Sequence, residues 1–280
     1  MVAAVVLGIV TLLLVNLADV ESAHARPLDE VSESGTIRIA VYRNFPPFSE
    51  VDGGNFRGVD VDIGRAIAAQ LDLRPDFMAV TAGETVDDDL RNAVWKGHYL
   101  GGGVADLMLH VPIDRRFAMR NNHVMLFGAY ARMQLVQASD RRAGDAAVDL
   151  ADIGDRKIAV EIATLGDYYL VSAFGGQLRD NVVHYSSAIS GVQALRDGEV
   201  AVALASRTEM EAGLGARRDD FTLNPVAIPG ASWLIGAAVD EYSRDLGYTV
   251  ADLLAAMVVD GSMAQIFAEH GLSYTPPDSE

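Results

Sequence analysis

Strands and helices alternate along this chain, and their order predicts an α/β protein of two similar lobes. The stretch TIRIAVY at 36–42 has apolar residues at every second position, which is the period of a strand. It is followed by GVDVDIGRAIAAQLDL at 58–73, where Ile63, Ile67 and Leu71 fall on one helical face behind two acidic residues that suit a helix start. The same order recurs as far as residue 204 and predicts mostly parallel sheets flanked by helices.

The other elements are expected in the same alternating order from residue 75 onward. They are a strand at 75–80, a helix at 84–97, strands at 105–111 and 157–160, a helix from Thr164, a strand at 182–185, a helix at 186–198 and a strand at 199–204.

Two extended stretches, 128–139 and 229–240, are expected to carry the chain out of one lobe and back again. Two helices, at 243–261 and 263–271, are expected to end the chain. We therefore expect a discontinuous first lobe of residues 26–130 and 234–280 and a second lobe of residues 131–233. A cleft between such lobes is where ligands usually bind.

Charge and composition exclude several classes of function. The 280 residues carry a formal net charge of −17, and no run of Lys or Arg is longer than two, so nucleic-acid binding is not expected. The chain has no cysteine, which excludes disulfides and thiolate metal sites. We expect no metal, because VDDDL at 86–90 has the acids of an ordinary first helical turn, and no cofactor. No nucleophile motif indicates an enzyme, so no catalytic residue is expected.

The N-terminus has the pattern of an export signal. Residues 2–15 are continuously apolar, which is short for a membrane span of about 20 residues and suits the core of a signal peptide. The sequence AHA at 23–25 supplies the small residues of a cleavage site, so residues 1–25 are expected to be a signal peptide cut after Ala25. An uncleaved anchor is the alternative. Either arrangement places the body outside the cytoplasm, and we expect it in the periplasm.

Five segments resemble the periplasmic solute-binding proteins of the polar amino acid type, family three of the extracellular binding proteins. They are GTIRIAVYRNFPPFSEVD, FRGVDVDIGRAIAAQLDL, RKIAVEIATLGDYYL, ALRDGEVAVAL and VVDGSMAQIFAEHGL. The resemblance implies a two-lobed, type II binding-protein fold, a monomer, a small-molecule ligand and an ABC permease as partner. In addition, LRNAVWKG followed by ADLMLHVP is similar to binding-protein-like accessory proteins found beside quinoprotein alcohol dehydrogenases.

The resemblance implies two groups of ligand-binding residues in the first lobe. In PIDRR, Asp114 and Arg115 match the turn whose arginine pairs with the ligand's α-carboxylate. A local pair of Arg115 with Asp114, or a helix cap, is the alternative. The rings of NFPPF, Phe45 and Phe48, are implied to line the cleft, and packing within the lobe is the alternative.

Three further residues are expected at the cleft. Thr164 begins a helix whose free amides suit an anionic group, and a plain helix cap is an equal alternative. Glu161, just before that helix, is expected to face the cleft. His110 stands where the family often has serine or threonine and is expected to line the cleft, with a place in the core as the alternative.

Two positions depart from the family's pattern. Tyr42 and Ser206 stand where the resemblance implies acids that hold the ligand's α-ammonium. A lone arginine without those acids favours a carboxylate-bearing solute over an ordinary α-amino acid. Glu84, Glu161 or Glu209 could supply the missing acid, and their spacing does not choose among them.

The expected function is therefore capture of a small polar, carboxylate-bearing solute for an ABC-type importer. The alternative is a periplasmic accessory protein of a quinoprotein (PQQ) alcohol dehydrogenase, with a repurposed cleft. An enzyme on the same fold is a third hypothesis, which needs a catalytic acid or base that the sequence does not identify.

Overall fold

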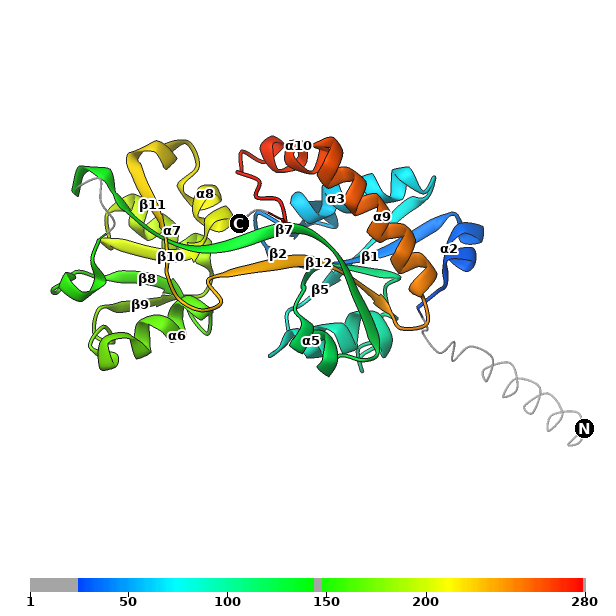
Figure 1. Ribbon diagram of the computed structural model, residues 1–280, viewed down its shortest axis with the longest axis horizontal. Coiled ribbons are helices and arrows are strands. Elements are labelled where there is room, and N and C mark those ends of the chain that lie inside the picture. The colour runs from blue at the N-terminus through cyan, green and yellow to red at the C-terminus, as the bar shows by residue number, and fades with distance from the viewer. Residues whose placement is uncertain (1–24, 144–147, 279–280) are drawn as a thin grey trace, which may run out of the picture.

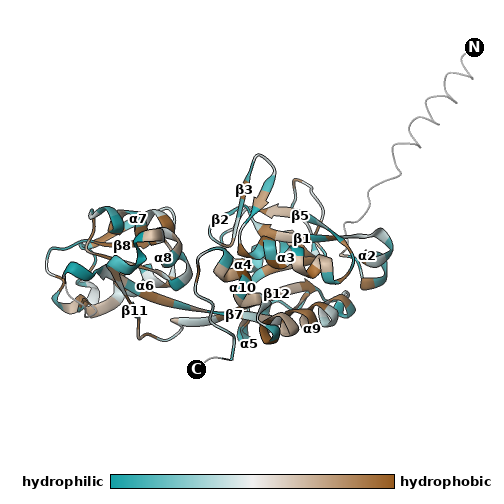
Figure 2. Ribbon diagram, turned by 90° about the horizontal axis from the view of Figure 1, so that it is seen from above, coloured by the Kyte–Doolittle hydropathy of each residue, from teal (hydrophilic) through white to brown (hydrophobic). Residues whose placement is uncertain are grey.

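The computed structural model describes residues 25–143 and 148–278. Its main sheet has nine strands in the order β5-β1-β6-β12-β7-β10-β8-β9, and β11 also pairs with β7. Figure 1 shows two lobes side by side, joined by the long strands β7 (Val124–Asp140) and β12 (Ser232–Asp240), and Figure 2 shows the same arrangement from above. The predicted two-lobed α/β architecture is confirmed. The predicted signal peptide lies outside the described residues, apart from Ala25.

The first lobe is built around three parallel strands. In these, β1 (Thr36–Tyr42) pairs with β5 (Arg74–Val80) on one side and with β6 (Leu107–Pro112) on the other. Helices cover both faces of this sheet. They are α3 (Val59–Gln70), α9 (Arg244–Asp260) and α10 (Ser262–Glu269) on one face, and α4 (Val86–Leu90), the π-helix η1 (Arg91–Trp95) and α5 (Arg115–Arg120) on the other.

The second lobe repeats this plan with its own core. Its parallel strands are β10 (Val202–Ser206), β8 (Ile158–Glu161) and β9 (Val182–Tyr185), and β11 (Phe221–Pro225) pairs antiparallel with β7. The helices α7 (Ala188–Asp197) and α8 (Arg207–Leu214) supply one core cluster, and α6 (Leu165–Ser172) supplies another. Parallel strands end at a common edge, so Glu161 and Ser206 come to the same edge of this sheet.

The crossing strands β7 and β12 connect the lobes through an antiparallel ladder whose register shifts once, between Ile235 and Ala237. Their antiparallel pairing runs from Asp240 opposite Val124 to Ser232 opposite Gln134. From Leu135 onward, β7 pairs with β10 instead. The predicted lobe boundaries, between residues 130 and 131 and between 233 and 234, fall inside these two strands and stay a prediction.

Most of the expected strands and helices are confirmed within a few residues. The expected helix at 84–97 is shorter and changes from α4 to a π-helix at Arg91. Some short elements were not predicted from the sequence. They are α2 (Leu28–Ser34), the three-stranded sheet β2 (Asn44–Phe45), β3 (Ser49–Asp52) and β4 (Asn55–Arg57), and the helices α5 and α8.

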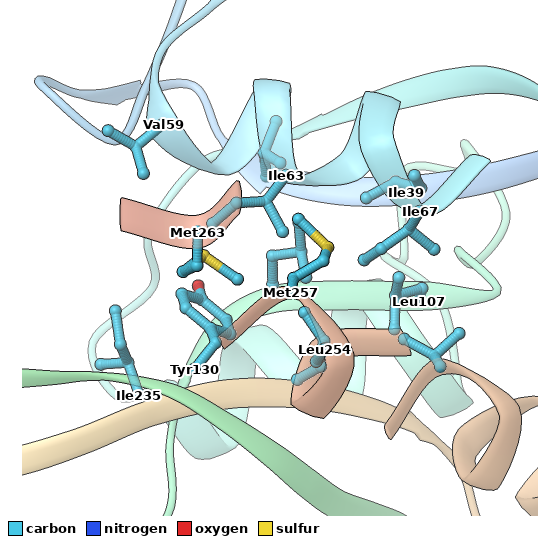
Figure 3. Close-up of a cluster of buried hydrophobic side chains, with 14 of the residues drawn as sticks. Ile39, Val59, Ile63, Ile67, Leu107, Tyr130, Ile235, Leu254, Met257 and Met263 are labelled. Atoms are coloured by element: carbon cyan, nitrogen blue, oxygen red, sulfur yellow. The ribbon is translucent and has the colours of Figure 1, made fainter. Parts of the chain in front are cut away.

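The C-terminal helices α9 and α10 belong to the first-lobe core. Leu254, Met257 and Met263 from these helices pack against Ile63 and Ile67 of α3, as Figure 3 shows. Within the described residues, no single helix is long and apolar enough to cross a membrane. Only α9 and α10 taken together have the length and apolar composition of a membrane span, and the two helices are bent by 75° relative to each other.

The turn that carries NFPPF is held against the start of α3 by backbone contacts. The amides of Val59 and Asp60 donate to the carbonyl oxygens of Pro47, at 3.1 Å, and Phe48, at 2.9 Å. Gly58 has a φ of +122°, and a Cβ atom there would lie 2.3 Å from the carbonyl oxygen of Phe48. The turn can approach the helix this closely because residue 58 has no side chain.

We expect Gly58→Ala to lower the free energy of unfolding by about 2 kcal/mol or more, because positive-φ strain adds to a backbone collision. Gly54→Ala is the control, since Gly54 has a φ of +87° and open space around its Cβ position. Chemical denaturation of both variants measures the difference. Equal losses in the two variants would show that the close approach of the turn does not constrain residue 58.

Candidate functional site

A cavity of about 400 Å³ lies between the strand ends of the second lobe and two aromatic side chains, Phe45 of β2 and Trp233 of β12. Most of its lining is apolar, and its charged residues are Glu161 and Glu209. No Lys, Arg or His of the described chain is among the lining residues. The others are Leu135, Thr164, Leu165, Gly166, Ala188, Leu204, Ala205, Ser206 and Gly230.

Glu209 is fixed at the cavity by a reciprocal cap at the start of α8. The hydroxyl and the amide of Ser206 both donate to Glu209 Oε2, at 2.5 Å and 3.2 Å. The amide of Glu209 donates back to the Ser206 hydroxyl at 3.3 Å. Because this capping box uses Oε2, the second carboxylate oxygen is left for other partners.

Glu161 is the last residue of β8, beside the end of β10. Its Oε2 accepts a hydrogen bond of 3.0 Å from the amide of Ala188, the first residue of α7. Glu161 lines the cavity. A role in ligand binding stays a proposal.

The two cavity carboxyls affect each other's charge. Burial raises the pKa of Glu161, and the neighbouring negative charge of Glu209 raises it further. Burial also raises the pKa of Glu209, although the hydrogen bonds from Ser206 and the charge of His110 oppose that rise. Ionising either group in this cavity therefore costs more free energy than ionising it in water, and a cation between the two groups would reduce that cost.

Thr164 is the N-cap of α6. Its hydroxyl oxygen accepts from the amide of Asp167 at 3.3 Å and donates to the carbonyl oxygen of Glu161 at 2.8 Å. The helix-cap alternative thus accounts for the hydroxyl. Thr164 also lines the cavity, so its methyl group and backbone remain available to a ligand.

The aromatic residues after β1 are divided between the cavity and the core. Phe45 lines the cavity and stacks on Phe48, with ring centroids 5.2 Å apart. Phe48 is 0% exposed within the first-lobe core, so it supports Phe45 from behind. Tyr42 does not line the cavity either, because its hydroxyl is directed to Asp89 at 2.8 Å.

Asp114 and Arg115 also lie away from the cavity lining. Asp114 caps α5 by accepting from the amide of Phe117 at 2.8 Å. Arg115 is the first helical residue and is exposed, and its side chain makes no hydrogen bond or ion pair with other described residues. The helix begins only three residues after β6, which places Arg115 on α5 instead of in the wall of the cavity. Its predicted role as carboxylate anchor stays a prediction.

His110 lies directly behind the aromatic wall and does not line the cavity itself. Its ring is 4.8 Å from that of Phe45, and its Nδ1 is 3.0 Å from Asp60 Oδ2. His110 thus packs within the first lobe, next to the aromatic wall of the cavity, and a role in ligand binding stays a prediction.

The structure brings two of the three candidate acids to the cavity. Glu161 and Glu209 line it, whereas Glu84 is exposed in the loop before α4. The pattern Ser-x-x-Glu at 206–209 is a capping-box signal that could have placed Glu209 beside Ser206. Trp233 was missed, because no sequence pattern marks the point at which a crossing strand meets the second lobe.

We expect Glu161→Gln to raise the melting temperature of the ligand-free protein at about pH 7, because it removes a buried carboxyl whose folded pKa is raised. A raised folded pKa means that unfolding becomes easier as pH rises from the unfolded pKa through the folded pKa. The gain should therefore disappear at about pH 4. Glu84→Gln, at an exposed position, should change little. Thermal unfolding across pH tests this, and a variant less stable than wild type at neutral pH would contradict it.

Comparisons with known proteins agree with this architecture. Residues 37–93 match the model of the bacterial extracellular solute-binding proteins, family 3. No curated protein sequence matches the chain. Among solved structures, an ancestral cationic amino acid solute-binding protein is similar with a TM-score of 0.68 and 18% identity, over 86% of this chain and 98% of that one.

Two further structures cover the chain to a similar extent. A substrate-binding protein of a polar amino acid ABC uptake transporter from Streptococcus thermophilus has a TM-score of 0.66 and 16% identity, over 89% of this chain and 90% of that one. A cysteine-binding protein from Campylobacter jejuni has a TM-score of 0.59 and 19% identity, over 90% and 96%. The described chain thus has the α/β fold of type II periplasmic binding proteins, and its residues 37–93 match the family 3 model.

Proposed function

We propose that this protein is an exported solute-binding protein that encloses a small ammonium-bearing solute between its lobes and delivers it to an ABC-type importer. The observation that carries this proposal is the pair of carboxylates, Glu161 and Glu209, in a cavity whose described lining has no cationic side chain. The family 3 segment and the binding-protein fold support the transport role.

The chemistry of the lining favours an organic cation. Burial raises the pKa of both carboxyls, and a bound ammonium would supply a positive charge that stabilises their ionised forms. Phe45 and Trp233 offer aromatic faces, which attract cations and pack against an apolar ligand body. A purely anionic solute would meet two like charges here and gain nothing from them.

The position of the cavity supports capture by lobe closure. Most of its lining comes from the second lobe, while Phe45 comes from the first lobe across the crossing strands. A ligand that touches both lobes favours the arrangement in which its contacts on both sides are made. A rotation about β7 and β12 would be the motion that makes these contacts.

We further propose that the solute also carries a carboxylate and that Arg115 binds this group. This side chain follows the carboxyl end of β6, the same sheet edge from which β1 leads to Phe45, because β1 and β6 are parallel. It is exposed and has no partner in the described chain, so it is available to a solute carboxylate when the lobes close. An α-amino acid would then use the two glutamates for its ammonium and Arg115 for its carboxylate.

Thermal-shift and calorimetric screening of residues 26–280 against amino acids, amines and organic acids tests the ammonium proposal. We expect shifts with ammonium-bearing compounds and none with organic acids that lack an amine. Glu209→Gln, which keeps the capping box, should weaken binding about tenfold or more by removing a charge-assisted contact. Glu84→Gln is the matched control. Binding of organic acids alone would overturn the proposal, and no binding at all would favour the quinoprotein accessory alternative.

A matched pair of ligands tests Arg115. The compounds L-phenylalanine and 2-phenylethylamine differ only by the carboxylate. If Arg115 binds that group, Arg115→Ala should weaken binding of the amino acid about tenfold or more and leave binding of the amine almost unchanged. Arg116→Ala, at the exposed neighbouring position, is the control. If Arg115→Ala weakens binding of both ligands equally, or changes binding of neither, then Arg115 does not bind the carboxylate.

A further inference from the structure

The C-terminal tail, residues 272–278, runs from the end of α10 to the crossing strand β7. Both views of the ribbon show this course, with the tail between the two lobes (Figures 1 and 2). In β7, the amide of Arg132 donates to the carbonyl oxygen of Thr275 at 2.9 Å. The hydroxyl of Tyr274 donates to the carbonyl oxygen of Tyr130, also in β7, at 2.8 Å. The tail is therefore a third segment at the crossing, in addition to β7 and β12.

The beginning of the tail is fixed to the first lobe. Leu272 belongs to the first-lobe core, and its amide donates to the carbonyl oxygen of Phe267 at 3.0 Å. The ring of Tyr274 packs on that of Phe267, with centroids 5.2 Å apart. Just before the tail, His270 Nε2 is 2.8 Å from Asp62 Oδ2 of α3. The tail should therefore move with the first lobe.

The second lobe contacts this tail through Glu211 of α8. The amide of Ser273 donates to Glu211 Oε2 at 2.6 Å. The other carboxylate oxygen, Oε1, is 3.5 Å from the guanidinium of Arg218, which follows α8 in the second lobe. The Glu211 side chain is only 3% exposed. A hydrogen bond to a carboxylate is stronger than one between neutral groups, so this contact is a firm link between the lobes.

Helix α8 presents Glu209 to the binding cavity and Glu211 to the tail. Successive residues of an α-helix are turned by about 100°, so side chains two residues apart leave the helix in nearly opposite directions. Phe45, from the first lobe, lines the cavity with Glu209. A movement of α8 that brings Glu209 closer to Phe45 therefore moves Glu211 away from Ser273.

Breaking this contact would not leave a buried carboxylate without a partner. Glu211 would keep Arg218, because both residues belong to the second lobe. A second cavity of about 450 Å³ lies at the same place, and its lining includes Glu211, Arg218 and His270. A cavity of this size with polar walls admits water, which can replace the lost amide donor. The contact can therefore break and form again without the cost of an unpaired buried charge.

We propose that the contact between Glu211 and Ser273 is a latch that holds the lobes apart in the ligand-free protein and breaks when they close on a solute. This inference rests on the proposed function and concerns the regulation of its binding site. Part of the free energy of solute binding is then used to break the latch, so the latch lowers the affinity. Glu211 is a positioning residue, because it acts on the solute only through the movement of α8.

Calorimetry with L-phenylalanine and 2-phenylethylamine as probes tests the latch in variants of the protein. Glu211→Ala removes the acceptor, so it should bind the probes about threefold or more tightly than wild type while its melting temperature falls. Structural damage alone would lower both affinity and melting temperature. Ser273→Pro removes the amide donor and leaves Glu211 paired with Arg218, and it should also bind more tightly.

Two controls separate the latch from general effects. Ser273→Ala changes the side chain and keeps the amide that donates to Glu211. Asp219→Asn removes a negative charge from the lining of the same cavity. Neither control should change the affinity for the probes.

Hydrogen exchange of single amides measures the latch directly. In the ligand-free state, the Ser273 amide should exchange more slowly in wild type than in Glu211→Ala. Saturating L-phenylalanine should speed its exchange in wild type about tenfold or more, because closure breaks the bond. The Arg132 amide, which is bonded to Thr275, should keep its protection in both states. Unchanged or slower exchange of the Ser273 amide on binding would show that the latch does not break.

The outcomes separate this inference from the proposed function. If the probes bind wild type, but Glu211→Ala and Ser273→Pro bind them no more tightly, the latch is wrong while the ammonium site stands. If the Ser273 amide exchanges equally fast in ligand-free wild type and Glu211→Ala, the latch is wrong whether or not a probe binds. If no probe binds wild type, the proposed function is wrong and the role of the latch in binding fails with it.

Discussion

The antiparallel pair of β7 and β12 is the constraint on which the rest of the structure depends. The two strands pair from Val124 to Gln134 with one register shift, between Ile235 and Ala237, and β7 then changes partner to β10 at Leu135. Two separate cores are thereby held on one hydrogen-bonded ladder, and relative motion of the lobes must come from bending or twisting of these strands. Leu135 and Trp233, which lie where the partner changes, both line the cavity. A ligand in this cavity would therefore contact the same segment about which we propose that the lobes move.

The sequence predicted the regular part of the fold because hydrophobic periodicity is a local property. The alternation in TIRIAVY matched β1, and the apolar face at 58–73 matched α3. The short elements α5 and α8 were missed, because six or eight residues are too few for a helical period to stand out. Their caps, Asp114 and Ser206, were noticed for possible chemistry and not for helix initiation. The pairing of β7 with β12 and then with β10 joins strands that are far apart in the sequence, so no local sequence pattern predicts it.

The site was only partly predictable, for a related physical reason. Sequence position implied that Ser206 replaces an acid, and from this the ammonium clamp appeared to be lost. In the fold, Glu209 returns its carboxylate to Ser206 through the capping box, so the negative charge is restored one helical turn later. The expected preference for a carboxylate-bearing solute came from residue positions along the chain, and it stays a prediction. The contact of Asp60 with Tyr130 spans 70 residues and had no sequence signal.

The distribution of charge in the cavity is one-sided. Two carboxyls share a mostly apolar wall, and burial opposes their ionisation by raising the pKa of each. Hydrogen bonds from Ala188 and Ser206 satisfy one oxygen of each group, and these contacts fix the carboxyls without neutralising them. The proposed ligand ammonium would provide a charge that the described lining does not, and its binding energy would then include relief of this repulsion. Because Phe45 belongs to the other lobe, that relief would be greatest with the lobes closed around the ligand, which would link solute charge to closure.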